Sequence, residues 1–464
     1  MITYKHLLCS LGLLSFALLT FSCTTKAKKE TLTVDKATVE KATPYFTGYL
    51  NGQTNPYTTE TPIALSDINK LQASVWQAWV NANNSFSEQK LPQLDKLANA
   101  KSGSWQLPSN LEPNATMPFY WGYKGDSIPQ EGYPLFLYLH GSGPKAQEWK
   151  AGLFICNGFD DAPSAYFIPQ IPNEGEYYRW WQKSKQFAWE RLLRQAFVSG
   201  KFNPNRIYCF GISEGGYGSQ RLASFYADYL AAAGPMAGGE PLKNAPAENC
   251  RNIAFSLRTG ADDAGFYRNK LTQYTKDEFA RLQSLYPNNY TNKIELIPGY
   301  QHAIDYKPTT PWLKQYVRNP YPKSFNWENF EMDGLYRKGF YNLAVVERSN
   351  DNEESRTYYE MNINDNKIDL KADIVTYKCI ETDPHWGIQL KFEKSYQPAT
   401  KGKVIIYLND QLVDLNREVI LTVNGKEMFR GIVKPELRHL INSCATFFDS
   451  ERLYPAAIEV EISK

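Results

Sequence analysis

Residues 206–218 read RIYCFGISEGGYG, and this stretch decides how the rest of the chain is interpreted. The apolar run 206–210 predicts a buried strand, and a helix is predicted to begin at about Glu214. Gly211 and Gly215 flank Ser213, which suits a sharp strand-to-helix bend where larger side chains would clash. The first N–H groups of the helix and the positive end of its dipole would face the same point. The pattern therefore predicts that Ser213 is a nucleophile rather than an idle serine in a glycine-rich turn.

The sequence around this turn alternates between strand and helix patterns. A helix is expected over 186–198, where apolar residues recur at helical spacing. Strands are expected at 117–124, 133–139, 165–168, 253–258 and 293–297. Such alternation predicts an α/β fold with a mostly parallel sheet covered by helices on both faces.

Three groups of polar or glycine residues follow predicted strands and supply the other parts of an acyl-transfer site. His140-Gly141-Ser142-Gly143 follows the strand 133–139, and its backbone N–H groups are candidates to bind an oxyanion. Asp262 and Asp263 follow the strand 253–258, and either carboxylate is a candidate to orient a histidine. His302 follows the strand 293–297 and is the candidate base.

The other histidines are weaker candidates for the base. His140 belongs to the glycine-rich turn, whereas His385 and His439 fall in a later region of strand patterns.

The order and context of these motifs over residues 115–322 resemble the α/β-hydrolase superfamily, specifically its carbohydrate-esterase and prolyl-oligopeptidase-like branch. The resemblance implies that Ser213 is the nucleophile and His302 the base. A Gly-x-x-Asp pattern in related hydrolases favours Asp263 as the acid, with Asp262 as the second choice. The oxyanion hole is then expected from backbone N–H groups of three residues, Gly141, Ser142 and Glu214. No metal or organic cofactor is expected.

The N-terminus resembles a bacterial lipoprotein signal. A short basic start precedes an apolar run over 7–21, which is too short to cross a bilayer comfortably. Cys23 follows this run and is the expected lipidation site, so residues 1–22 are expected to be removed. We therefore expect a protein anchored in the bacterial cell envelope, on the periplasmic side or the outer surface. Palmitate labelling of a Cys23→Ala form would contradict this expectation.

The other expected domain boundaries follow from changes in polarity and in strand or helix pattern along the 464 residues. Residues 23–43 are polar and are expected to be a tether, and 44–115 are expected to pack on a hydrolase domain over 116–322. Strand patterns dominate 323–464, and Asn424-Gly425 is a strong hairpin signal between two of them. A C-terminal all-β domain, expected as a sandwich, is therefore predicted.

The amino-acid composition limits the classes of binding partner that are expected. The 51 Lys and Arg residues nearly balance the 49 Asp and Glu residues, which gives no sign of nucleic-acid binding. The aromatic content of 14% is typical of secreted proteins that stack rings on sugars. The layout resembles lipoprotein esterases of polysaccharide-utilisation loci, a group that includes pectin methylesterases. We therefore expect a serine carboxylic-ester hydrolase acting on an esterified plant polysaccharide or oligosaccharide, in the first place a pectin methyl ester.

Other functions remain open at this point. Acetyl and feruloyl esters are alternatives, as is a prolyl-oligopeptidase-like serine peptidase or an inactive glycan-binding lipoprotein. The segment before the 186–198 helix is rich in aromatic residues, and its expected substrate contacts are Tyr178, Arg179, Trp180 and Trp181. The rings would stack on sugars, and Arg179 would pair with a uronate carboxylate.

Overall fold

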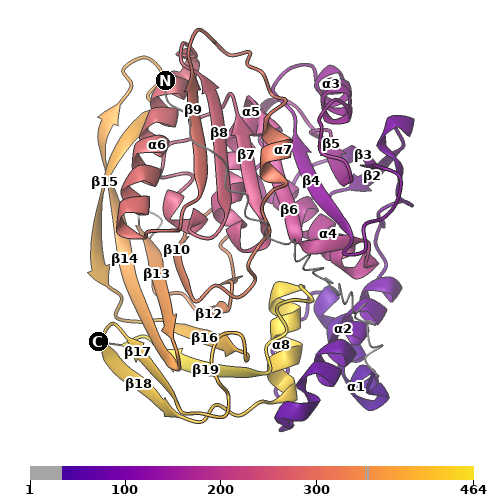
Figure 1. Cartoon of the computed structure of the whole chain (residues 1–464), viewed down its shortest axis with the longest axis vertical. Coiled ribbons are helices and arrows are strands. Elements are labelled where there is room, and N and C mark those ends of the chain that lie inside the picture. Colours follow the sequence, from indigo (N-terminus) through magenta and orange to yellow (C-terminus); the bar gives the residue numbers. More distant parts are fainter. Residues whose placement is uncertain (1–33, 351, 353–354, 464) are drawn as a thin grey trace, which may run out of the picture.

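The computed structural model describes residues 34–350, 352 and 355–463 (Figure 1). The predicted signal peptide and Cys23 lie outside these residues. Within the described ranges, no helix combines the length and apolarity needed to cross a membrane.

The first elements of the described part are two helices, α1 (Lys36–Leu50) and α2 (Ile68–Ser85). The Asp35 side chain accepts a hydrogen bond from the backbone N–H of Thr38 and so caps α1. Phe46 packs edge-on against Trp79 of α2, with ring centroids 5.1 Å apart. The predicted tether is therefore wrong from residue 36 onward, because an N-cap and a buried apolar face fix this segment as a helix.

A nine-stranded sheet forms the centre of the described chain. Its strands are β1 (Asp95–Lys96), β2 (Ser102–Gln106), β3 (Thr116–Lys124), β4 (Tyr133–Leu139), β5 (Ser164–Pro169), β6 (Phe202–Ile212), β7 (Ala232–Met236), β8 (Ala254–Gly260) and β9 (Asn292–Ile297). The order is β1-β3-β5-β4-β6-β7-β8-β9, with β2 on β3. Strands β4 to β9 pair in parallel, whereas β3 is antiparallel to β2 and β5. This mostly parallel sheet fits the predicted α/β-hydrolase fold.

Helices cover both faces of the sheet. The helices are α3 (Lys145–Asn157), α4 (Lys183–Ser199), α5 (Glu214–Phe225), α6 (Arg268–Leu285) and α7 (Thr309–Leu313). Alternate side chains of β4 point to opposite faces: Leu135 shares a core with Trp189 of α4, and Phe136 shares another with Trp149 of α3. Short 3₁₀ turns connect several elements, at Leu65–Asp67, Leu97–Asn99, Gly175–Tyr177, Ala227–Tyr229, Ala247–Cys250 and Gly265–Tyr267.

The C-terminal region contains two further sheets. The first comprises β10 (Ser324–Asn329), β13 (Ser355–Asn364), β14 (Lys367–Thr382), β15 (Gln389–Pro398), β17 (Val419–Val423) and β18 (Lys426–Gly431). The second comprises β11 (Gly339–Phe340), β12 (Leu343–Glu347), β16 (Lys403–Leu408) and β19 (Ala456–Glu461). The rings of Trp327 in the first and Phe340 in the second stack 5.3 Å apart. Asn424 and Gly425 join β17 to β18 with positive φ at both residues, as a type I′ turn requires.

This region is not all-β, contrary to the prediction. Helix α8 (Leu437–Phe447) lies between β18 and β19. Its buried residues Leu437, Leu440, Ile441 and Cys444 recur at helical spacing and share a core with Trp79 of α2. The N-terminal helices therefore pack on the C-terminal region (Figure 1). They also reach the central layer, where Arg194 of α4 donates hydrogen bonds to the Asn83 and Glu88 side chains.

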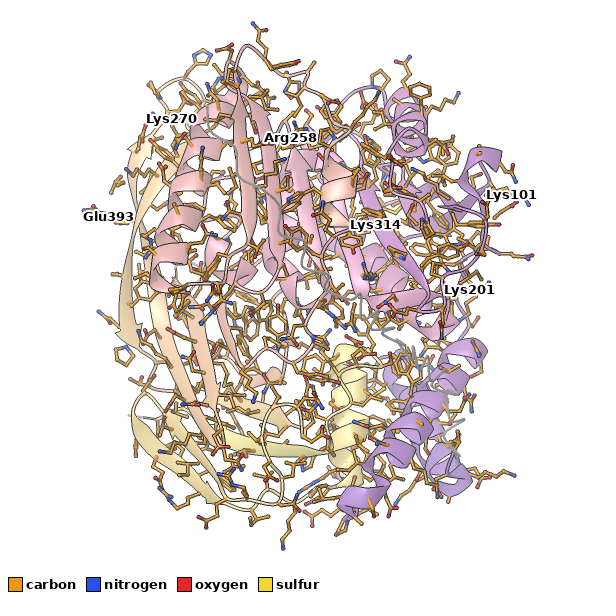
Figure 2. The ribbon with its side chains drawn as sticks, viewed as in Figure 1. Lys101, Lys201, Arg258, Lys270, Lys314 and Glu393 are labelled. Atoms are coloured by element: carbon orange, nitrogen blue, oxygen red, sulfur yellow. The ribbon has the colours of Figure 1, made fainter. Side chains whose placement is uncertain are left out.

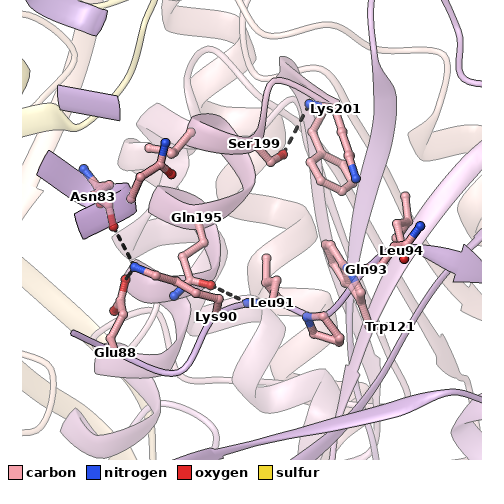
Figure 3. A pocket seen from close by; sticks show the side chains of 14 residues that line it. Asn83, Glu88, Lys90, Leu91, Gln93, Leu94, Trp121, Gln195, Ser199 and Lys201 are labelled. Carbon is pink, nitrogen blue, oxygen red and sulfur yellow. Dashed lines mark hydrogen bonds and ion pairs between the residues drawn. The ribbon is translucent and has the colours of Figure 1, made fainter. Parts of the chain in front are cut away.

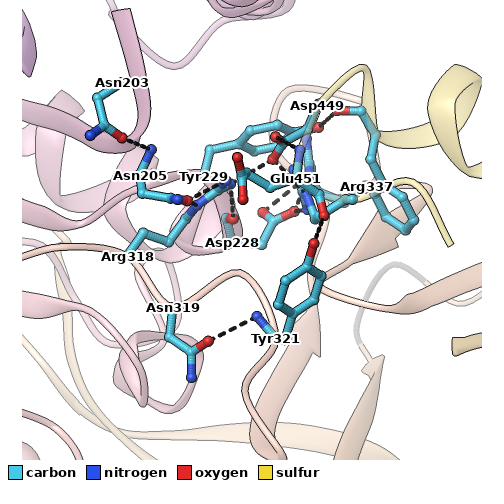
Figure 4. A network of polar contacts seen from close by, with 12 residues as sticks. Asn203, Asn205, Asp228, Tyr229, Arg318, Asn319, Tyr321, Arg337, Asp449 and Glu451 are labelled. Carbon is cyan, nitrogen blue, oxygen red and sulfur yellow. Dashed lines mark hydrogen bonds and ion pairs between the residues drawn. The ribbon is translucent and has the colours of Figure 1, made fainter. Parts of the chain in front are cut away.

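A buried polar network joins the sheet-and-helix layer to the C-terminal region (Figure 4). Asp449 accepts from Arg318 at 2.7 Å and from Arg452 at 2.9 Å, and Asp228 accepts from Arg452 at 2.6 Å and from Arg337 at 2.9 Å. Burial alone would raise the pKa of Asp449, but the Arg318 and Arg452 charges outweigh it and hold that pKa below its ordinary value. Removing the Asp449 charge leaves the buried Arg318 guanidinium without its carboxylate partner.

Asp449→Asn is expected to lower the free energy of unfolding at pH 7 by about 3–5 kcal/mol. The pKa of Asp449 is lower in the folded than in the unfolded chain, where it is about 3.9. The contribution of Asp449 to the free energy of unfolding is therefore fully present above about pH 3.9 and is lost as the pH falls through the folded pKa. Urea unfolding at pH 7 and pH 3 measures both effects, and the variant should lose less stability on acidification than the parent. Asp365→Asn removes the exposed ion pair with Arg417 and should leave the midpoint unchanged. Equal midpoints for parent and Asp449→Asn at pH 7 would contradict a stabilising network.

Candidate active site

Ser213 occupies the tight bend between β6 and α5. Its backbone has φ 57° and ψ −114°, a strained conformation for a residue with a side chain, and its N–H donates to the Met236 carbonyl at 3.0 Å. A Cβ added to Gly215 would lie 1.9 Å from the Leu139 carbonyl oxygen, so only glycine permits this approach of α5 to the end of β4. The bend therefore presents the serine side chain at the edge of the sheet where the parallel strands end.

The structure brings His302 and Asp263 to this serine. His302 Nε2 lies 3.0 Å from Ser213 Oγ, and His302 Nδ1 lies 2.8 Å from Asp263 Oδ2. A carboxylate only accepts, so the imidazole carries its proton on Nδ1 and accepts from the serine through Nε2. The close approach of the two loops depends on Gly260, since a Cβ there would lie 2.0 Å from the Gln301 carbonyl oxygen.

The structure distinguishes the two adjacent aspartates. Asp263 is buried, and its second oxygen accepts a hydrogen bond from Arg268 Nη1 at 2.9 Å. Asp262 is exposed, and the hydrogen bonds of His302 in the described structure go to Ser213 and Asp263. Arg268 was not anticipated, although an arginine at the start of the helix that follows an acid loop could have suggested such a partner.

The glycine-rich turn after β4 lies against Ser213. A Cβ added to Gly141 would lie 3.4 Å from Ser213 Cβ. The His140 imidazole is buried and hydrogen-bonded on both nitrogens, since Nε2 accepts from the Ile171 N–H and Nδ1 donates to the Gly141 carbonyl. Burial lowers the pKa of His140 to about 4, so the ring stays neutral and holds the turn at pH 7. His140 therefore supports the turn through its side chain.

The backbone N–H groups of this region are available to an oxyanion. The Gly143 N–H donates to the Tyr178 hydroxyl at 3.3 Å. Among the described hydrogen bonds, none is donated by the backbone N–H of Gly141, Ser142 or Glu214. These are the three groups expected to form the oxyanion hole, and they flank Ser213 from two segments of the chain.

Two of the four predicted substrate contacts are wrong. Trp180 is fully buried, and its Nε1 donates to the His140 carbonyl at 2.9 Å. Tyr178 is also buried, and its hydroxyl donates to the Gly141 carbonyl at 2.8 Å. Both side chains therefore hold the His140–Gly143 turn in place, because their rings are buried in the core and their polar atoms bond the backbone of this turn.

The other two predicted contacts lie at the surface. The Arg179 side chain is 47% exposed, with one guanidinium nitrogen 3.6 Å from a Glu214 carboxylate oxygen. Trp181 is half-buried, and the Arg221 guanidinium stacks on its ring at 3.8 Å from the centroid. Arg221 also pairs with Glu240 at 2.7 Å. An exposed cation therefore lies beside Glu214, the residue after Ser213, and the Trp181 ring centroid lies 6.0 Å from that cation.

Glu214 itself is a buried acid next to the reacting serine. Burial raises the pKa of its carboxyl to about 7, although the Arg179 guanidinium acts in the opposite direction. Its Oε1 has no hydrogen-bond partner in the described structure. The carboxyl is therefore partly protonated near neutral pH.

The cavity shown in Figure 3, of about 350 Å³, is a different site. It is lined by Lys90, Leu91, Trp121, Gln195 and Lys201 among others, close to the start of β6. Ser213 follows the opposite end of that eleven-residue strand, roughly 30 Å away at 3.3 Å per residue. Among the described residues, no group of three or more His, Cys, Asp or Glu side chains is placed to hold a metal ion.

Comparison with known proteins gives partial structural likenesses. No protein-family model matches the chain, and no curated protein matches it. A thermostable esterase is 17% identical, with a TM-score of 0.36 over 48% of this chain and 64% of its own. A putative dipeptidyl aminopeptidase IV from Bacteroides ovatus is 11% identical, with a TM-score of 0.35 over 46% of this chain and 34% of its own. A ferulic acid esterase from Anaeromyces mucronatus is 13% identical, with a TM-score of 0.31 over 48% of this chain and 89% of its own.

The matched part thus spans less than two thirds of the first two proteins. The chemistry of this chain rests on the geometry of Ser213, His302 and Asp263.

Proposed function

We propose that the protein is a serine carboxylic-ester hydrolase. The observation that carries the proposal is the continuous hydrogen-bonded series from Ser213 Oγ through His302 to the buried Asp263 carboxylate, with distances of 3.0 and 2.8 Å. A hydroxyl activated by a histidine, oriented in turn by a carboxylate, is the arrangement that acyl transfer needs.

The reaction follows from these positions. Ser213 Oγ attacks the ester carbonyl as His302 Nε2 takes the hydroxyl proton, and Asp263 stabilises the imidazolium that forms. The backbone N–H groups of Glu214 and the Gly141–Ser142 turn stabilise the oxyanion, each donor contributing about 3 kcal/mol to the transition state. His302 then protonates the departing alcohol. In the second half, it removes a proton from water, which releases the acid and restores Ser213.

The substrate we propose is an esterified plant polysaccharide or oligosaccharide, in the first place a pectin methyl ester. The His302 side chain is 45% exposed, so the reacting centre lies open to solvent and accommodates an ester carried on a large chain. Arg179 is exposed beside Glu214 and offers a partner for the carboxylate of a neighbouring uronate. Acetyl and feruloyl esters use the same chemistry, with a different acyl or alcohol group.

The experiment that tests this function is incubation with methyl-esterified pectin, acetylated xylan and feruloylated arabinoxylan, with methanol, acetate and ferulate measured separately. Methanol is expected as the main product. Acetate or ferulate alone would redirect the proposal to the other esters. Cleavage of an Xaa-Pro p-nitroanilide with none of the three products would contradict an esterase.

A further inference from the structure

Two exposed aromatic rings lie side by side at the loop that carries the proposed catalytic acid. Phe266 follows Asp263 by three residues and is 47% exposed. Trp386 lies in the turn between β14 and β15 and is 57% exposed. Their ring centroids are 5.1 Å apart at an interplanar angle of 44°. The pair therefore forms an open, angled apolar surface, here named the Phe266–Trp386 platform, to which the central layer and the C-terminal region each contribute one ring.

The backbone on the Phe266 side holds its ring outward at a cost. Phe266 and Tyr267 both adopt positive φ, 51° and 59°, which bulky residues rarely do. The Arg268 guanidinium lies 5.3 Å from the centroid of the Phe266 ring and donates to Asp263. It also lies 5.9 Å from the ring of Tyr217, one helical turn after Ser213. The platform is thus connected to the proposed triad through a single arginine.

The turn on the Trp386 side is fixed by its own hydrogen bonds. The Asp383 carboxylate accepts from the backbone N–H groups of His385 and Trp386, and the Asp383 N–H donates to the Ile388 carbonyl at 2.9 Å. The His385 ring packs edge-on against Trp386 with centroids 4.6 Å apart. The indole is therefore presented by an ordered turn.

The β14–β15 hairpin is also anchored to helix α6 of the central layer, close to the platform. Glu381 of β14 pairs with Lys270 of α6 and accepts from the Tyr274 hydroxyl at 2.6 Å. The long β14–β15 hairpin runs beside α6 (Figure 1), and Lys270 lies at the end of the helix nearest its turn (Figure 2). These contacts keep the Phe266 and Trp386 rings next to each other, and the outer faces of both rings remain in solvent.

We propose that the Phe266–Trp386 platform is a sugar-binding subsite that stacks on a pyranose ring of the polysaccharide whose ester is cleaved at Ser213. This inference rests on the proposed function, because the subsite positions a polymer relative to the triad. The apolar face of a pyranose matches an exposed aromatic surface, and the outer faces of this pair remain in water, where they are open to such a ring. It also gives the C-terminal region a role, since that region supplies the Trp386 ring.

The test compares full-length chains by two measurements. Affinity electrophoresis in gels containing methyl-esterified pectin, acetylated xylan or feruloylated arabinoxylan measures polymer binding, in a Ser213→Ala background so that the polymer stays intact. Hydrolysis of p-nitrophenyl acetate by chains that retain Ser213 measures the reacting centre without a sugar. Trp386→Ala is expected to weaken retardation by at least one polymer about tenfold and to change kcat/KM for p-nitrophenyl acetate less than twofold. Trp386→Phe should restore most of the binding.

Leu285→Ala is the matched control, because Leu285 is as exposed as Trp386, at 57%, and ends α6 about 25 Å from its start. It should change neither measurement. Equal retardation of parent and Trp386→Ala overturns the subsite, as does a parent that none of the three polymers retards. A parent that hydrolyses no ester overturns the proposed function instead, which the p-nitrophenyl acetate assay reports independently of binding.

Discussion

Ser213→Ala is expected to lower kcat for p-nitrophenyl acetate by roughly a million-fold, to the background of the assay. The hydroxyl is the atom that forms the covalent intermediate, and its loss leaves His302 and Asp263 without a group to activate. Because Ser213 is half-buried and its backbone conformation is set by Gly215 and Met236, the smaller alanine should fit the bend without disturbing the fold.

Ser219→Ala provides the matched control for this substitution. Ser219 is a buried serine on the same helix, and its hydroxyl donates to the Gly216 carbonyl at 3.2 Å. This variant should keep kcat within a few-fold of the parent. Circular dichroism and urea unfolding would verify that both variants fold. Substantial ester hydrolysis by folded Ser213→Ala would mean that another group performs the attack.

Asp263→Asn is expected to lower kcat by about 10⁴-fold. An amide in place of the carboxylate can donate to His302 Nδ1, which favours the tautomer that cannot accept the serine proton. It also removes the charge that stabilises the imidazolium. Steady-state hydrolysis of p-nitrophenyl acetate across pH 6–9 measures the loss.

Asp262→Asn supplies the comparison at the adjacent position. Asp262 is exposed, so its amide variant should retain kcat within a few-fold of the parent. A larger loss for Asp262→Asn than for Asp263→Asn would mean that the acid of the triad has been assigned to the wrong residue.

The elements that position the site were predictable because their signals are local. The strand over 133–139 and the helix from Glu214 are observed at those positions. Glycine on both sides of Ser213 specifies a bend that few other sequences permit. His302 could be selected among the histidines because it follows the strand β9, whereas His140 belongs to the glycine-rich turn and His385 and His439 fall in the later region of strand patterns.

What the sequence could not show depends on contacts between distant segments. Tyr178 and Trp180 look like sugar-stacking residues by type, yet their polar atoms bond the backbone of the His140 turn and their rings are buried. Burial of this kind follows from packing that no local pattern encodes. The pairing of Phe266 with Trp386 is a similar case, since 120 positions separate two residues that meet only through the hairpin and α6.

Secondary structure was missed where apolar spacing was ambiguous. Helix α8 is short and lies among strands, so its apolar residues predict a continuation of the β region. Strands β10 and β13 do alternate apolar with polar residues, as in Phe325-Asn326-Trp327-Glu328, and they lie in the region over which strand patterns are predicted. The polar lysines and threonines at the start of α1 predict a tether, whereas the inner face of this helix carries Ala42 and Phe46.

The most direct test of the nucleophile is covalent labelling of the intact protein with a fluorophosphonate, followed by mass spectrometry and peptide mapping. We predict one phosphonyl group per chain, attached to Ser213, and none on Ser213→Ala. A protein that stays unmodified under conditions that label a known serine esterase, or that carries the group on another residue such as Ser142, would contradict the central claim.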